Sequence, residues 1–238
     1  MIRFALVSIF VVSTALACGA SSPAGPSALS WHYDEVYIAQ LSLDEKAKVL
    51  SAQNLYQRAR AEQMKAAADL SESSTELNVS KNEQKQSLLS ERSASQQKKA
   101  AEDSGDMTRI NQASKAMRIA ELTRRSADEK ISYLNANRKY LQKYLLYCQE
   151  ETYHREARYE HEKAKLGQSK NIAPKGIQYD KFSGQTAQRS KQSQIAKQRA
   201  KNEKQKADQV KAVWQKRVQE TNQSRGVPSS STSSSSES

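Results

Sequence analysis

The chain has 238 residues, a formal net charge of +12, 37% hydrophobic residues and 6% aromatic residues. Only 7 Gly and 4 Pro are present, too few to separate many short strands. Gln, Lys, Glu, Ala and Ser dominate, a composition typical of long helices with narrow apolar seams, and it argues against a thick globular core. The positive charge bears on the choice of partners and not on the fold.

The N-terminus has the pattern of a secretory signal peptide. Arg3 precedes an uncharged apolar run over residues 4–16, shorter than the roughly 20 residues of a membrane-spanning helix. Two cleavage sites fit the residues that follow. Ala15-x-Ala17 suits an ordinary signal peptidase, whereas Ala17-Cys18-Gly19 resembles the lipobox of bacterial lipoproteins, with Ala15 and Leu16 departing from its commonest form.

The lipoprotein resemblance covers about residues 1–19 and has three implications. It implies that residues 1–17 are removed and that Cys18 becomes an acylated first residue, which attaches the protein to a membrane. The absence of Asp after Cys18 implies sorting to the outer membrane of the cell envelope, facing the periplasm. Residues 18–29 are small and interrupted by proline, so we expect a flexible tether.

Residues 30–166 are expected to form a long antiparallel helical hairpin of coiled-coil type. The strongest segment steps by three and four residues over about five heptads, the spacing of a coiled-coil seam; a single buried helix of a globular domain is the alternative. Its members are Ile110, Ala113, Met117, Ala120, Arg124, Ala127, Ile131, Leu134, Arg138, Leu141, Leu145 and Cys148.

A second set of positions precedes it with the same spacing. Although residues 31–38 have the β-branched and aromatic content of a short strand, we expect a helix there, restarting at a capping box over residues 42–45. The seam then thins over residues 71–97, where we expect fraying. The set comprises Leu29, Tyr33, Val36, Gln40, Leu43, Ala47, Leu50, Asn54, Gln57, Ala61, Met64 and Ala68.

The two arms are expected to turn at Gly105, since Gly ends helices in the left-handed conformation and Asp106 can cap the next helix. Counting outward from Gly105 places Met64 near Leu145 and Leu50 near Tyr159. A Tyr stripe flanks the main seam, so a third helix or a second chain should pack there. The stripe consists of Tyr133, Tyr140, Tyr144 and Tyr147.

The last part of the chain is divided by Gly and Pro. Residues 167–184 are expected to be a linker, residues 185–222 a third helix, and residues 223–238 a disordered Ser-rich tail. Apolar positions of the third helix at helical spacing are Ala196, Ala200, Ala207, Val210 and Trp214. The fold class is therefore all-α.

Residues 161–225 contain 16 Lys and Arg against 5 Asp and Glu, which accounts for most of the excess charge. The plain interpretation is a solvated helix face. The alternative is attraction to an anionic envelope surface, such as cell wall or lipopolysaccharide. We expect no nucleic-acid partner, because the export signal disfavours one and no interleaved aromatic residues supply a stacking platform. The candidate surface-binding residues are Lys191, Lys197, Arg199, Lys201, Lys204, Lys206 and Lys211.

The chain lacks a pattern for catalysis, a metal or a cofactor. His154 and His161 lie seven residues apart, whereas zinc-binding helices place His at i and i+4. If Cys18 is acylated, Cys148 is a lone thiol, expected as a small buried hydrophobe, with pairing to a second chain as the alternative.

The sequence thus favours a non-catalytic scaffold, spacer or binding protein of the cell envelope that is anchored at one end by lipid. A homo-oligomer is compatible with this interpretation. An envelope protein is a further candidate partner. Its architecture is broadly similar to periplasmic coiled-coil proteins such as the Skp chaperone and the hairpins of efflux adaptors. A periplasmic chaperone that binds unfolded or envelope proteins is therefore the alternative function, and it would need a clamp-like cavity.

Overall fold

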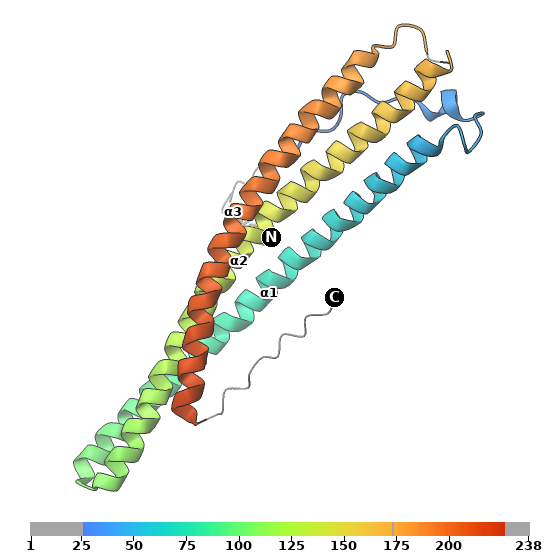
Figure 1. Cartoon of the computed structure of the whole chain (residues 1–238). Helices are drawn as coiled ribbons and strands as arrows, with labels where there is room; N and C mark the ends of the chain where they lie inside the picture. Colours follow the sequence, from blue (N-terminus) through green and yellow to red (C-terminus); the bar gives the residue numbers. More distant parts are fainter. Residues whose placement is uncertain (1–25, 173, 227–238) are drawn as a thin grey trace, which may run out of the picture.

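The computed structural model describes residues 26–172 and 174–226, and these residues form helices and loops without strands. A short 3-10 helix, η1 (Glu35–Ile38), precedes three long helices: α1 (Ala47–Ser104), α2 (Met107–Ser169) and α3 (Tyr179–Arg225). At about 1.5 Å per residue, α2 alone is roughly 95 Å long. The all-α prediction is confirmed, and the molecule is an elongated rod (Figure 1).

Helix α2 is the central element of the rod. It packs against α1 along one side and against α3 along another, whereas no Cα atom of α1 comes within 8 Å of one in α3. Figure 1 shows α2 between the other two helices over the upper half of the view, and the tip of the α1–α2 hairpin extends beyond the end of α3. The three helices therefore make a layer instead of a closed bundle.

The turn between α1 and α2 lies where the sequence predicts it. Gly105 has a φ of 70°, a left-handed conformation that glycine adopts without steric cost. Asp106 caps α2, because its carboxylate accepts hydrogen bonds from the backbone N–H groups of Thr108 (2.8 Å) and Arg109 (3.3 Å). A cap of this kind stabilises a helix by about 1 kcal/mol.

The predicted seam of α2 is confirmed. Ala120, Leu134 and Cys148 are buried and all other members except Arg138 are at least partly buried. One member of the Tyr stripe meets the expected third helix, since Tyr133 stacks on Trp214 of α3 with ring centroids 5.4 Å apart, whereas Tyr144 donates a hydrogen bond to Glu62 of α1. Two different sides of α2 are thus covered by two different helices.

The predicted seam of the first arm is wrong. Within α1, every one of its members is exposed, with Leu50 at 37% and Met64 at 68% of full exposure. The side that packs on α2 has the same spacing in a different register and includes Val49, Ala52, Ala59, Ala66, Ser73, Leu77, Ser80, Ser87, Ala94 and Ala101. Met64 and Leu50 therefore point away from α2. Instead, Tyr56 and Glu62 of α1 contact Tyr159 and Tyr144 of α2, respectively.

Two other expectations for the first arm also need correction. Residues 71–97 do not fray; they continue α1 because three polar side-chain pairs join the helices there: Gln84–Asp128 (2.6 Å), Lys130–Glu83 (2.8 Å) and Arg124–Glu91 (2.6 Å). Residues 31–38 are mostly extended chain, and only η1 is helical. The capping box does form, with Ser42 and Glu45 bonded reciprocally, although α1 begins at Ala47.

The apolar core is concentrated at the end of the rod opposite the Gly105 turn. There the start of α1, the end of α2, the start of α3 and the chain before η1 meet, and their buried residues form one cluster of Tyr33, Ile38, Val49, Ala52, Tyr159, Ala164 and Phe182. The loop between α2 and α3 spans residues 170–178, so both helices extend into the expected linker of 167–184. Residues 227–238 of the Ser-rich tail lie outside the described residues.

Candidate functional site

Helix α3 uses a regular heptad seam to pack on α2. Its buried and half-buried positions alternate by four and three residues along the whole helix, so one narrow side faces α2. Many of these residues are small or polar, which lets the helices approach closely. The seam consists of Phe182, Thr186, Arg189, Ser193, Ala196, Ala200, Glu203, Ala207, Val210, Trp214, Arg217 and Thr221.

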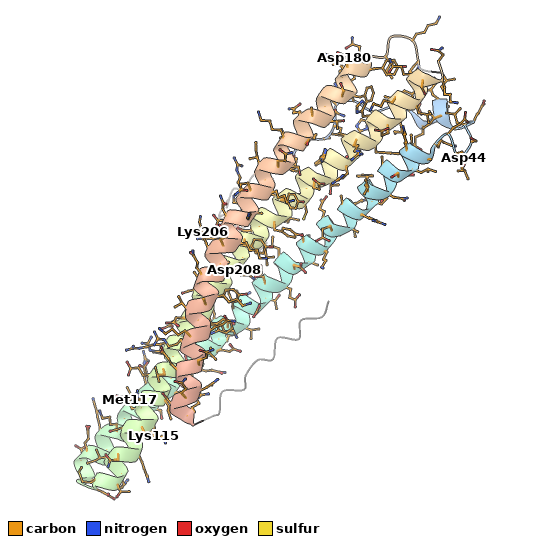
Figure 2. All side chains as sticks on the ribbon, viewed as in Figure 1. Asp44, Lys115, Met117, Asp180, Lys206 and Asp208 are labelled. Atoms are coloured by element: carbon orange, nitrogen blue, oxygen red, sulfur yellow. The ribbon has the colours of Figure 1, made fainter. Side chains whose placement is uncertain are left out.

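None of the seven candidate basic residues belongs to this seam. Lys191, Lys197, Arg199, Lys201, Lys204 and Lys206 are exposed, and Lys206 is labelled halfway along the rod in Figure 2. Lys211 is half-buried, with its ammonium group 5.8 Å from the centre of the Tyr133 ring, so it contributes to packing on α2. The structure therefore leaves six of the seven exposed, and these six are called the basic surface of α3 below. Lys197, Lys201 and Lys204 lie on one side of the helix, and Arg199 and Lys206 lie on the other.

Charge on this surface is only partly neutralised. Lys206 forms an ion pair with Glu203 at 2.7 Å, whereas the other five exposed residues make no ion pair within 4.0 Å among the described residues. The hydrogen bond from Lys206, followed by the charges of Lys206, Lys139 and Lys143, lowers the pKa of Glu203. Lys139 and Lys143 belong to α2, and their proximity to α3 could not be predicted because they are distant in sequence from the basic third.

An N-terminal strap, residues 26–34, runs along the α2–α3 pair. Gln185 of α3 accepts hydrogen bonds from the backbone N–H groups of Ser30 and Trp31, both at 3.0 Å, and donates one to the carbonyl of Trp31. The strap begins at Pro26, which lines a groove together with Lys143 and Arg199. The strap therefore starts near the middle of the rod, at the basic surface.

Arg189 holds the start of the strap and was not among the candidate residues. It is a basic residue of α3 that is buried, and its guanidinium donates to the backbone carbonyls of Ser27 and Ala28. The same group lies over the ring of Tyr153, 5.1 Å from its centre, and 3.6 Å from the Glu150 carboxylate. Its place in the α3 seam was the signal in the sequence that distinguishes it from the exposed Lys residues.

A buried ion pair holds the other end of the strap. The Lys163 ammonium lies 2.8 Å from the Glu160 carboxylate, and both side chains are less than a tenth exposed. Glu160 also accepts a hydrogen bond of 2.6 Å from the backbone N–H of Tyr33. The Tyr33 ring lies against Gly167, where an added Cβ would be only 1.8 Å from the phenol oxygen. Removing either charge would deprive the other buried group of its nearest counter-charge, which is costly, and would leave Lys163 only the more distant Glu35 carboxylate at 3.6 Å.

The remaining residues considered for chemistry lie in ordinary structural positions. No group of three or more His, Cys, Asp or Glu that could hold a metal ion occurs among the described residues. His154 is half-buried next to Glu151 at 3.5 Å. Cys148 is a free, buried thiol, and burial raises its pKa to about 11, so the reactive thiolate is not formed at neutral pH.

Cys18, the candidate lipidation site, lies outside the described residues. Within the part of the chain that the structure covers, no helix combines the length and the apolar character needed to cross a bilayer. Comparisons with protein-family models, with curated proteins and with solved structures found no match.

Proposed function

We propose that the protein is an exported, non-catalytic scaffold or spacer of the cell envelope, anchored by acylated Cys18 and facing the periplasm from the outer membrane. Support comes from the lipobox-like residues around Cys18, the long helical rod and the basic surface of α3. The mechanism is physical: the lipid holds the chain at the membrane, the basic surface attracts acidic groups, and the hairpin provides reach.

The observation that carries this proposal is the position of Pro26. It lies beside Lys143 and Arg199, so a chain anchored upstream leaves the folded body at the basic surface. Lys143 lies roughly 54 Å from the start of α2 and roughly 39 Å from its end, at 1.5 Å per residue. The tether thus joins the middle of the rod.

This geometry changes the expected orientation of the anchor. The chain between Cys18 and Pro26 can span at most roughly 29 Å even when fully extended. That distance is shorter than either arm of the rod measured from the same point, so a lipid at Cys18 holds the rod near its middle and not at one end. Exposed Lys and Arg near an anionic membrane surface each contribute about 1 kcal/mol, which favours a side-on arrangement with α3 toward that surface.

A test separates the anchor from the basic surface. Cys18→Ser is expected to move the protein from the membrane fraction to the soluble periplasmic fraction, because stable attachment depends on the acyl chains. Lys197→Gln, Lys201→Gln and Lys204→Gln together are expected to weaken binding of the Cys18→Ser protein to anionic vesicles, and wild-type binding should fall with added salt. Lys81→Gln, Lys85→Gln and Lys99→Gln together, at exposed positions on α1, remove the same charge and serve as the matched control.

Each half of the proposal can fail separately. Membrane attachment that survives Cys18→Ser overturns lipid anchoring. Vesicle binding that ignores both salt and the three α3 substitutions overturns the role of the basic surface. The alternative function, a periplasmic chaperone, requires a clamp-like cavity, and the single layer in which α2 contacts both other helices gives it less support than the scaffold.

A further inference from the structure

The outer side of α1 carries an apolar stripe that no other described element covers. It is the heptad set expected to pack inside the hairpin, and it begins near Asp44, labelled at one end of the rod in Figure 2. Leu43, Leu50 and Met64 are 72%, 37% and 68% exposed, respectively. The remaining members, all exposed, are Ala47, Asn54, Gln57, Ala61 and Ala68.

This stripe has the geometry of a second packing seam. With a coiled-coil repeat of 3.5 residues, its centre lies roughly 150° around α1 from the seam that packs on α2. Helix α2 carries two seams related in the same way, one for α1 and one for α3. A helix docked on the outer stripe of α1 would therefore continue the layer by one more member.

The stripe is more apolar than a part of the inner α1 seam that does pack on α2. The part of the inner α1 seam that packs on α2 between residues 73 and 101 is mostly Ser, Gln and charged residues around Leu77, Ala94 and Ala101. The outer stripe has two Leu, one Met and three Ala in a shorter length. Because about 25 cal/mol is gained per Å² of apolar surface buried, covering it would stabilise a complex by more per residue than the packing of the hairpin tip.

The shape and charge of this side indicate what kind of helix fits. Leu43, Ala47, Leu50 and Asn54 line a groove of about 420 Å³, whose rim includes Arg58. Arg58, Arg60 and Lys65 flank the stripe, are exposed, and make no ion pair within 4.0 Å among the described residues. Asp44 is the one acidic flanking residue between positions 43 and 68. The flanks therefore favour a partner with acidic side chains.

The same charges suit an acidic partner better than a second copy of this chain. An antiparallel pairing about the middle of the stripe would place Asp44 of one chain beside Lys65 of the other and would leave Arg58 and Arg60 without acidic partners. A parallel pairing would place Arg60 of one chain beside Lys65 of the other. Like charges at flanking positions destabilise helix pairing.

We propose that the outer side of α1, together with the turn before it, binds between Leu43 and Ala68 an amphipathic helix of another protein, with an apolar heptad stripe flanked by Asp and Glu. The apolar stripe supplies affinity, and Arg58, Arg60 and Lys65 select the acidic partner and its register. This site is separate from the basic surface of α3, and it does not depend on lipid anchoring.

The test uses the purified full chain and two labelled synthetic peptides of four heptads. The peptides share a Leu/Ala stripe and differ only in carrying Glu or Lys at the flanking positions. Fluorescence anisotropy should show the Glu peptide binding about tenfold more tightly or better, as expected for three exposed ion pairs. Leu50→Glu with Met64→Glu should abolish binding, whereas Val79→Glu, at an exposed position outside the stripe, should leave it unchanged.

A charge-reversal variant tests the role of the flanking residues most directly. Arg58→Glu with Lys65→Glu should reverse the preference toward the Lys peptide, with circular dichroism unchanged because both side chains are exposed. The proposal is overturned if the two peptides bind equally or neither binds, or if Leu50→Glu with Met64→Glu leaves the affinity unchanged. It is also overturned if the wild-type chain is a dimer in sedimentation and that double variant is a monomer, since the stripe would then be an interface between copies.

Discussion

Tyr133 of α2 and Trp214 of α3 stack with their ring centroids 5.4 Å apart and their planes within 8° of parallel. Both rings come from the heptad positions by which α2 and α3 face each other, and Lys211 adds its ammonium group 5.8 Å from the same tyrosine ring. Most other residues of the α3 seam are small or polar. Among the described residues the Tyr133–Trp214 stack is the one aromatic pair between α2 and α3.

Trp214→Ala should loosen the C-terminal half of α3. Fully burying a Trp is worth about 3–5 kcal/mol against Ala, and this side chain is half-buried, so we expect a loss of about 2 kcal/mol in the free energy of unfolding. Hydrogen exchange should accelerate in α3 beyond Ala207 and remain slow in the α1–α2 tip. Val213→Ala, at a position 56% exposed, is the control and should change little. Equal exchange rates in both variants would contradict a structural role for the stack.

Arg189→Ala should release the N-terminal strap without unfolding the rod. The substitution removes the hydrogen bonds to the carbonyls of Ser27 and Ala28 and leaves Glu150 without its cationic neighbour. We expect faster hydrogen exchange at Ser30 and Trp31 and faster proteolysis within residues 26–34, with helix content unchanged. Lys191→Ala, an exposed neighbour on the same helix, should behave like the wild type. A strap that stays protected in Arg189→Ala would mean that Gln185 and Glu160 suffice to hold it.

The two long arms differ in how far they could be predicted, and the reason is local composition. On α2 the side with the most apolar residues is also a side that packs on a neighbouring helix, so the heptad spacing of the apolar residues identifies it. On α1 the outer stripe holds Leu43, Leu50 and Met64, while the inner seam relies on Ser73, Ser80 and similar small residues. A search for the most apolar stripe therefore chooses the wrong side of α1, although it locates the helix.

The strap escaped prediction for a different reason. Leu29 and Tyr33 of the strap sit at helical spacing, but the conformation of the strap is set by contacts with residues more than a hundred positions away, such as Glu160 with Tyr33 and Gln185 with Trp31. Local pattern carries no information on such partners. Likewise, the basic character of α3 is readable from composition, whereas the burial of Arg189 and the nearby Lys139 and Lys143 emerge only from packing.

Acid should weaken the docking of α3 through Glu151. Burial alone would raise the pKa of this carboxyl from 4.5, but hydrogen bonds from His154 and Ser193 and the charge of Arg155 hold it at about 2. A carboxyl whose pKa is lower in the folded state stabilises the fold above about pH 4.5, and this contribution is lost as the pH falls toward 2. The Ser193 hydroxyl donates to Glu151 from α3 at 2.6 Å, so the loss falls on the α2–α3 contact.

The measurement is the fluorescence of Trp214 during acid titration in a Trp31→Phe background. Wild-type protein should lose α3 docking progressively below about pH 4.5. Glu151→Gln should be less stable at pH 7 and should show a flatter dependence on pH between 5 and 2. Glu72→Gln, exposed on α1 and without an ion pair among the described residues, is the control. Identical acid slopes for Glu151→Gln and the wild type would contradict this role.

Two glycines should respond in opposite directions to the same substitution. Gly105 ends α1 with a φ of 70°, and a Cβ there would meet nothing within 4 Å, so Gly105→Ala costs only the strain of the left-handed backbone. We expect a loss of about 1 kcal/mol in the free energy of unfolding. Gly184 lies inside α3 at an exposed position, also with nothing within 4 Å of a Cβ. Gly184→Ala should therefore stabilise the protein by about 0.5–1 kcal/mol, since Ala is the better helix former.

Urea unfolding followed by circular dichroism measures both changes in one experiment. The pair is informative because neither substitution creates or removes a side-chain contact, so the sign of each change reports backbone conformation alone. Gly105→Asn should lose less than Gly105→Ala, because Asn tolerates the left-handed conformation better. If Gly105→Ala and Gly184→Ala both stabilised the protein, the turn between α1 and α2 would not be left-handed at Gly105, and the hairpin would have to close through a different residue.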